Sequence, residues 1–275
     1  MGELSMARQI KDFTDEEMLD EATRILTNGF TLHHKQNMTR QELVDYCRRI
    51  GNTDDDKLGY MPFNPKDTPD ITLVTPGPNG LFGHSDLHWH SNGTVYHIGE
   101  FKEILIALYC EDECVDTVFS LLNNRDAFLD LSKEDQDYWR TIEVQLNNIH
   151  HGIYGEVQPK DDNSLDEYVQ MEPHKGDDRM PVVNTHPVDG QEFLYWQPPL
   201  IEKAWKDGKP TDVEEIKEKL KATLDRSIYQ HHIVFKKGDM LIMDQLYTLH
   251  RRSPVINKNR LLWRVAIDYT NTLDK

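Results

Sequence analysis

Apolar positions recur at helical spacing in two segments near the start of the chain. Residues 14–28 carry such a stripe, and Thr14 followed by Glu17 three residues later is a capping-box signal for a helix start. The same signal opens residues 39–50, which are followed by a glycine. The sequence therefore predicts helices over 14–28 and 39–50, with a short strand over residues 30–33 between them.

Further along, the apolar positions occur in short runs separated by Gly, Pro and charged turns. This pattern is typical of an all-β jelly roll interrupted by helices. The expected strands are 71–74, within the loop-rich residues 52–83, then 104–110, 116–120, 182–185, 192–196, 231–235, 240–244 and 261–269. The expected helices are 123–131, 134–143, 199–205 and 212–226.

One long segment has little apolar content. Residues 151–180 are acidic and rich in Gly, Pro and Asp, which is typical of a lid or a flexible insertion. No internal repeat and no change of composition marks a domain boundary. A chain of 275 residues is thus expected to form a single domain over 1–275.

Charge narrows the range of partners. A formal net charge of −17 disfavours nucleic acid, which requires a basic face, and weakly favours neutral or cationic small molecules. The simpler reading is that the acidity maintains solubility. The sequence has no run of about 18 apolar residues, so no membrane span is expected. The first residues lack the pattern of a signal peptide, so a cytoplasmic location is expected.

The sequence contains three cysteines. Their odd, sparse spacing argues against a disulfide framework. Zinc binding by the closely spaced pair would need two further ligands nearby, and His97 is the only close candidate. We expect reduced, structural thiols at Cys47, Cys110 and Cys114.

Two distant histidines suggest a metal site. His90 and Asn92 are two residues apart on an expected strand, so both side chains would point to one face. His250 follows 160 residues later, as expected for a ligand delivered from across a barrel. Iron(II) binds neutral imidazole and hard oxygen donors and leaves positions open for oxygen chemistry. An amide, Asn92, stands where the usual pattern has a carboxylate.

Two arginines follow His250 at ten and fourteen residues. Arg260 and Arg264 share one face of an expected strand, with Leu262 between them on that side. A guanidinium in such a place holds a carboxylate in a bidentate fork. This is the requirement for anchoring the far end of a 2-oxo diacid whose near end chelates iron.

Five motifs in this order resemble the taurine dioxygenase family of Fe(II)/2-oxoglutarate-dependent oxygenases over roughly residues 14–270. Each motif is weak alone, and the fixed order makes the set specific. The segments and the family patterns that they resemble are Trp89-His90-Ser91-Asn92 (W-H-[ST]-D), Asp116-Thr117 (the end of G-G-D-T), residues 184–190 (R-T-H-P-x-T-G), residues 238–245 with His250 (G-D-[LV]-x-x-W-D-N and a later H), and residues 260–264 (the terminal arginine pair).

The resemblance implies a fold, a chemistry and a set of roles. The fold would be mainly β with flanking helices around a double-stranded β-helix (jelly-roll, cupin-like) core. The cofactors would be Fe(II), 2-oxoglutarate as co-substrate and O2, with succinate and CO2 among the products. His90, Asn92 and His250 would bind iron, Thr117 and Arg260 would bind 2-oxoglutarate, and Arg264 would face a co-substrate or substrate carboxylate. Family members often form oligomers, so the resemblance leaves open whether this chain forms a homo-oligomer.

Asn92 leaves three readings open, in this order of preference. Its carbonyl oxygen ligates iron weakly in a working oxygenase that hydroxylates or otherwise oxidises a small molecule. Alternatively, Asn92 stands back and leaves a position for water or halide, as in related halogenases. In the third reading the chain no longer binds iron usefully and is a non-catalytic jelly-roll binding protein.

Two further residues are candidates for substrate binding. Asp86 lies four residues before His90 on the same expected face, where an acidic group would favour an amine-bearing substrate, although a surface turn is the simpler reading. His88 lies two residues before His90 and is either a neighbour of the site or a rival metal ligand. His186, in a Thr-His-Pro turn, is expected to be a buried hydrogen-bonding residue rather than a ligand.

Overall fold

The structure, a computed structural model, describes residues 8–51, 64–76, 86–91, 104–146, 179–195, 201–257 and 259–267. The places of Asn92 and of the zinc candidate His97 therefore lie outside the described residues. So does the lid expected at 151–180, of which only the last two residues are described.

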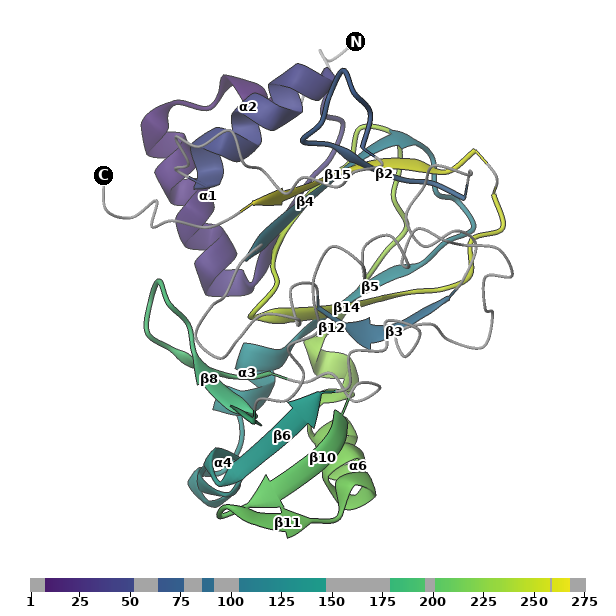
Figure 1. Ribbon diagram of the computed structural model, residues 1–275. Coiled ribbons are helices and arrows are strands. Elements are labelled where there is room, and N and C mark those ends of the chain that lie inside the picture. The colour runs from purple at the N-terminus through teal and green to yellow at the C-terminus, as the bar shows by residue number, and fades with distance from the viewer. Residues whose placement is uncertain are drawn as a thin grey trace.

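Two antiparallel sheets face each other and form the jelly roll that the sequence predicts (Figure 1). The first sheet has the order β1 (Phe30–His33), β13 (Met240–Asp244), β4 (Leu105–Asp112), β15 (Leu261–Ile267) and β2 (Thr72–Val74). The second has the order β12 (Gln230–Ile233), β5 (Phe119–Asn123), β14 (Thr248–Arg252) and β3 (Leu87–His90). Strands distant in sequence are neighbours in both sheets, so segments from the whole chain meet between them.

Alternation along the strands divides the core into two layers. On β4, Leu105, Ala107 and Tyr109 pack against the N-terminal helices, whereas Ile106, Leu108 and Cys110 face the second sheet. Strands β13 and β15 alternate in the same way, with Leu241, Met243, Leu262 and Ala266 facing inward. Because side chains alternate strictly along a strand, a polar residue in an inward register must lie between the two sheets.

The N-terminal helices cover the outer face of the first sheet (Figure 1). Helix α1 (Asp15–Asn28) has the predicted capping box at Thr14 and Glu17, and it ends at Gly29 with φ 81°. A Cβ there would lie 2.9 Å from Thr248 Cγ2, so both the backbone and the close approach to β14 require glycine. The short 3-10 turn η1 (Ile10–Asp12) precedes α1, and helix α2 (Arg40–Gly51) packs against both. In the described ranges no helix has the length and apolar character needed to cross a bilayer.

A second core lies below the second sheet (Figure 1). It is built from α3 (Asn124–Leu129), α4 (Lys133–Arg140), α6 (Val213–Leu224) and a sheet of order β11 (Lys209–Thr211), β10 (Ile201–Lys206), β6 (Ile142–Leu146) and β7 (Met180–Pro181). The hairpin of β8 (Val183–Thr185) and β9 (Glu192–Leu194) and the turn η4 (Ser227–Tyr229) complete the described elements.

The helix expected over 199–205 is wrong. Ile201 and Ala204 are spaced as in a helix, but the segment forms β10, which pairs with β6 and β11 and has a register shift between Ile201 and Lys203. The irregular pairing breaks the alternation that would have marked a strand. The helix expected over 134–143 is shorter than predicted. It ends at Arg140, because β6 begins at Ile142 and pairs with β10.

A buried hydrogen bond between His186 and Asp244 holds the turn between β13 and β14. His186 Nδ1 accepts a hydrogen bond from the Val188 amide at 3.2 Å, so Nε2 carries the ring proton and donates to Asp244 Oδ2 at 3.0 Å. The other carboxylate oxygen of Asp244 accepts the backbone amides of Leu246 and Tyr247. Both side chains are fully buried, and His186 is the hydrogen-bonding turn residue that the sequence predicts.

We predict that His186→Ala lowers the free energy of unfolding by about 2–3 kcal/mol, because the buried Asp244 carboxylate loses a charge-assisted hydrogen bond. His34→Ala is the matched control. His34 also pairs with an aspartate, Asp239, at 2.8 Å, but its side chain is 61% exposed, so its loss should cost less than about 1 kcal/mol. Urea unfolding at neutral pH measures both, and equal losses would contradict the role given to the buried pair.

Candidate metal centre and arginine pocket

His90 and His250 lie opposite each other on paired strands. β14 runs antiparallel to β3, with His250 in register with His90, and the centroids of the two rings are 4.2 Å apart. Both residues are buried, with exposed fractions of 2% and 7%. Because metal–nitrogen bonds are about 2 Å long, rings this close can reach a single ion.

Neighbouring groups fix both imidazoles. His90 Nδ1 donates to the carbonyl of His88 at 2.7 Å, which places its proton there and leaves the lone pair on Nε2. The ring of Phe119 stacks on His250, with centroids 5.4 Å apart and planes 20° from parallel. Burial lowers the pKa of His90 to about 4 and lowers that of His250 well below its usual value. Both rings are therefore neutral at pH 7, which is the form that binds metals.

The described residues supply only two of the ligands that a facial site needs. Across the described ranges, no group of three or more His, Cys, Asp or Glu side chains could hold a metal ion. A third protein ligand of these residue types would therefore have to come from outside these ranges. Asn92 follows directly on Ser91, the last described residue of that segment.

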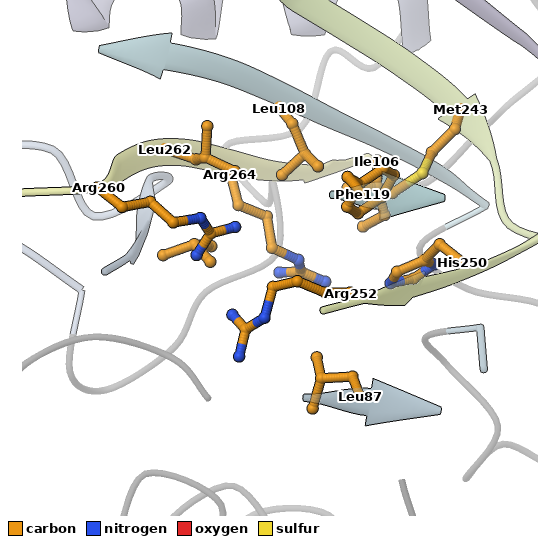
Figure 2. Close-up of a pocket in the computed structure, with 11 residues that line it drawn as sticks. Leu87, Ile106, Leu108, Phe119, Met243, His250, Arg252, Arg260, Leu262 and Arg264 are labelled. Carbon is orange, nitrogen blue, oxygen red and sulfur yellow. The ribbon is translucent and has the colours of Figure 1, made fainter. Parts of the chain in front are cut away.

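A pocket with three arginines adjoins His250 (Figure 2). Its walls are mostly apolar, and the positive charges come from β14, from the residue directly before β15 and from β15 itself. The lining residues are Val74, Leu87, Ile106, Leu108, Phe119, Met243, His250, Arg252, Arg260, Leu262 and Arg264. Arg260, Leu262 and Arg264 share the inward face, as their spacing predicts.

Arg252 is a pocket residue that none of the sequence motifs contains. It is 3% exposed and lies two residues after His250 on β14, so the strand turns both side chains to the same side (Figure 2). The period of two would have found it once His250 was placed on a strand.

Arg260 and Thr117 are buried polar groups that can receive an anionic ligand. Arg260 is 2% exposed, and its Nε and Nη1 have no hydrogen-bond partner among the described residues. The hydroxyl of Thr117, 2% exposed, likewise has none within the ranges described. Burial lowers the pKa of Arg260, which nonetheless remains a cation. Because an unsatisfied buried donor is costly, these atoms indicate a ligand that completes them.

The two substrate candidates lie apart from this pocket. The side chain of His88 is exposed, and its backbone carbonyl rather than its ring orients His90. Asp86 is half-buried immediately before β3, and neither residue lines the arginine pocket. Their roles in substrate binding stay predictions.

The donors present fit iron and a 2-oxo acid. Two neutral imidazoles at adjacent positions are suitable ligands for Fe(II). A buried guanidinium and a buried hydroxyl in the adjoining region suit the distal carboxylate of a dicarboxylate. The site thus contains the two kinds of group that the sequence analysis expected, brought together by strands from both sheets.

Comparison with known proteins agrees with this fit. The profile of the taurine catabolism dioxygenase TauD, TfdA family matches residues 7–266. The chain belongs to this family, so it is a 2-oxoglutarate-dependent dioxygenase, an oxidoreductase that uses Fe(II), 2-oxoglutarate and O2. Among curated proteins, no sequence is similar enough to match.

Solved structures show the same fold at low sequence identity. A protein assigned as an alpha-ketoglutarate-dependent taurine dioxygenase from Burkholderia xenovorans is 14% identical, with a TM-score of 0.70 over 96% of this chain and 85% of that chain. A taurine dioxygenase from Burkholderia xenovorans is also 14% identical, with a TM-score of 0.69 over 96% and 84%. AAD-2 in complex with Mn(II) and N-oxalylglycine is 15% identical, with a TM-score of 0.67 over 96% and 92%.

We predict that the metal-free protein loses stability as the pH falls from about 6.5 towards about 4. The upper value is the pKa of histidine in an unfolded chain, and the lower value is the pKa of His90 in the folded protein. In this window the unfolded chain binds a proton that the folded chain does not, so stability falls with pH. His90→Gln removes this titration and should flatten the fall, measured by chemical unfolding at several pH values. Identical slopes for both proteins would show that His90 is not held neutral.

Proposed function

We propose that this protein uses its iron centre to hydroxylate, or otherwise oxidise, a C–H bond of a small molecule, with succinate and CO2 as co-products. The observation that carries the proposal is the pairing of His90 with His250 beside a buried arginine pocket. Family membership favours this reading over a non-catalytic binding protein.

The roles of the residues follow from their chemistry and positions. His90 and His250 are proposed to ligate iron, with Asn92 as the third protein ligand through its carbonyl oxygen. Arg260 and Thr117 are proposed to bind the distal carboxylate of 2-oxoglutarate, which supplies the acceptor that their buried donors need. Arg264, on the same face of β15, is proposed to face a carboxylate of the co-substrate or the substrate.

The chain itself contributes orientation and a water-poor cavity. When bound, iron with 2-oxoglutarate and O2 supplies the oxidising power for breaking a C–H bond. Ile106, Leu108 and Leu262 surround the arginines with apolar walls, which strengthens the hold of a guanidinium on a carboxylate. Phe119 and the carbonyl of His88 keep the imidazoles in the orientation that a ligand requires. We further propose that residues 151–180 close this cavity.

A halogenase that uses the same centre is the second candidate. The observation that favours it is the amide at position 92, because an amide that does not ligate iron leaves a coordination position for halide. Chloride dependence of the product distinguishes the halogenase from the hydroxylase.

The substrate is proposed to be a small molecule, and two features of the site favour opposite charges on it. Asp86 favours an amine-bearing substrate, provided that its half-buried carboxylate reaches the substrate. Arg252 and Arg264 place positive charge in the pocket beside His250, where an anionic group would be preferred. A substrate panel that pairs amines with carboxylates of the same carbon skeleton decides between them.

We predict that Arg260→Met raises the Kd for 2-oxoglutarate by about 10–100-fold, since a charge-assisted hydrogen bond to the carboxylate is worth about 1.5–3 kcal/mol. Calorimetric titration of the Mn(II)-loaded protein measures this without turnover. Arg251→Met is the matched control, because Arg251 lies over the ring of Trp89, 4.5 Å from its centroid, and does not line the pocket. Equal effects of the two substitutions would remove Arg260 from the co-substrate site.

We predict that Asn92→Asp tightens Fe(II) binding by about tenfold, because a carboxylate is a stronger ligand than an amide. Asn37→Asp adds the same charge at an exposed position and should leave the affinity unchanged. Competition with a chromogenic chelator under anaerobic conditions gives both affinities. An unchanged affinity in Asn92→Asp would mean that position 92 does not ligate iron and would favour the open-position reading.

A further inference from the structure

Two cysteines lie directly beside the proposed 2-oxoglutarate anchor. Cys110 is near the end of β4, and Cys114 opens the turn that leads to Thr117. Both belong to the core between the two sheets, whereas Cys47 belongs to the core under the N-terminal helices. The pair therefore lies in the same layer as the arginine pocket.

The two thiols are already in contact. Their Sγ atoms are 4.0 Å apart, and both side chains are buried as free cysteines. Both thiols also point towards the carbonyl of Asp112, at 3.1 Å from Cys110 and 3.6 Å from Cys114. A disulfide requires the sulfurs to approach to about 2 Å. Of the intervening residues, Asp112 and Glu113 are exposed and Glu111 is half-buried, so this short segment can adjust without disturbing a packed core.

Cys114 touches both proposed co-substrate residues. Its backbone carbonyl accepts the amide of Thr117 at 3.0 Å, and its thiol is hydrogen-bonded to the guanidinium of Arg260. A change at this sulfur therefore acts on the threonine through the backbone and on the arginine through the side chain.

The surroundings make the two sulfurs unequal. The hydrogen bond from Cys110 and the positive charge of Arg260 lower the pKa of Cys114 against the effect of burial. The hydrogen-bond contact with Cys114, together with burial, raises the pKa of Cys110. Cys114 is thus the better thiolate and the better nucleophile, and Cys110 is positioned to resolve it.

We propose that Cys110 and Cys114 form a reversible disulfide that weakens the binding of 2-oxoglutarate. This inference rests on the proposed function, because Arg260 and Thr117 are taken as the co-substrate anchor. The sequence predicted only a structural role for these two thiols, and the proposed disulfide goes beyond that role.

The oxidant is a peroxide of the hydrogen peroxide class. The Cys114 thiolate attacks one peroxide oxygen and, after protonation of the leaving oxygen, gives a sulfenic acid and water. The sulfur of Cys110 then attacks the sulfenic sulfur, which forms the S–S bond and releases a second water. Two thiols are oxidised by two electrons, and one peroxide is reduced to two waters.

Closing the bond removes the sulfur partner of Arg260 and draws the turn that carries Thr117 towards β4. Both proposed anchors then lose their present orientation. We expect the Kd for 2-oxoglutarate to rise by about tenfold, the size typical of disturbing a group that orients a binding side chain.

The test uses the Mn(II)-loaded protein, so that iron does not decompose the peroxide. Protein is treated with hydrogen peroxide, quenched with catalase, denatured and alkylated. Mass spectrometry then follows the tryptic peptide of residues 103–125, which contains both cysteines and no other. The 2-oxoglutarate affinity of reduced, oxidised and re-reduced protein is measured by calorimetry, a series that needs no substitution.

We expect oxidised protein to give a peptide that lacks two hydrogens and resists alkylation, with 2-oxoglutarate affinity lowered and then restored by dithiothreitol. Cys47→Ala should behave as the unaltered protein, whereas C110S should stop at a sulfenic acid on Cys114 that dimedone traps. Full alkylation of both thiols after peroxide, or a disulfide that leaves the affinity unchanged, would overturn the inference. Failure of the reduced protein to bind 2-oxoglutarate would instead contradict the proposed function.

Discussion

The antiparallel pairing of β14 with β3 is the constraint on which the site depends. It sets His250 opposite His90 and turns both rings away from bulk water. β14 is itself held from its other edge by β5, whose Phe119 stacks on His250. At the start of β14, the buried pair of His186 and Asp244 fixes the turn from β13. The two proposed metal ligands are therefore positioned by backbone registers and not by their own side-chain preferences.

Burial gives these groups their chemical character. The imidazoles are kept neutral because charging them between the sheets is unfavourable, and neutral imidazole is what a metal binds. Arginine stays charged under the same conditions, and Arg260 keeps two donors without a partner among the described residues, so an anion suits it. A metal ion complements the neutral imidazoles, and a dicarboxylate complements the charged arginine, so one site suits both ligands. The same surroundings make Cys114 a better nucleophile than Cys110, since Arg260 lies beside it.

Local signals in the sequence predicted the parts of the fold that local interactions determine. The capping box of Thr14 and Glu17, the short apolar run of β4 and the spacing of Arg260 and Arg264 all correspond to observed geometry. Non-local pairing was harder to foresee. β10 has helical spacing and becomes a strand by pairing with β11 and with β6, which lies more than fifty residues earlier. β14 was not foreseen because Thr248, His250 and Arg252 make its inner face polar, and the functional residues thereby hide the apolar pattern of a strand.

The central claim is that His90, His250 and the arginine pocket assemble one iron and 2-oxoglutarate site despite Asn92. Its most direct test is an anaerobic titration of the metal-free protein with Fe(II) and then 2-oxoglutarate, followed by visible absorption. The account predicts a metal-to-ligand charge-transfer band that needs both additions and that disappears on exposure to O2 with formation of succinate. Absence of the band at saturating concentrations would contradict the account and leave the jelly roll without its proposed iron and 2-oxoglutarate site.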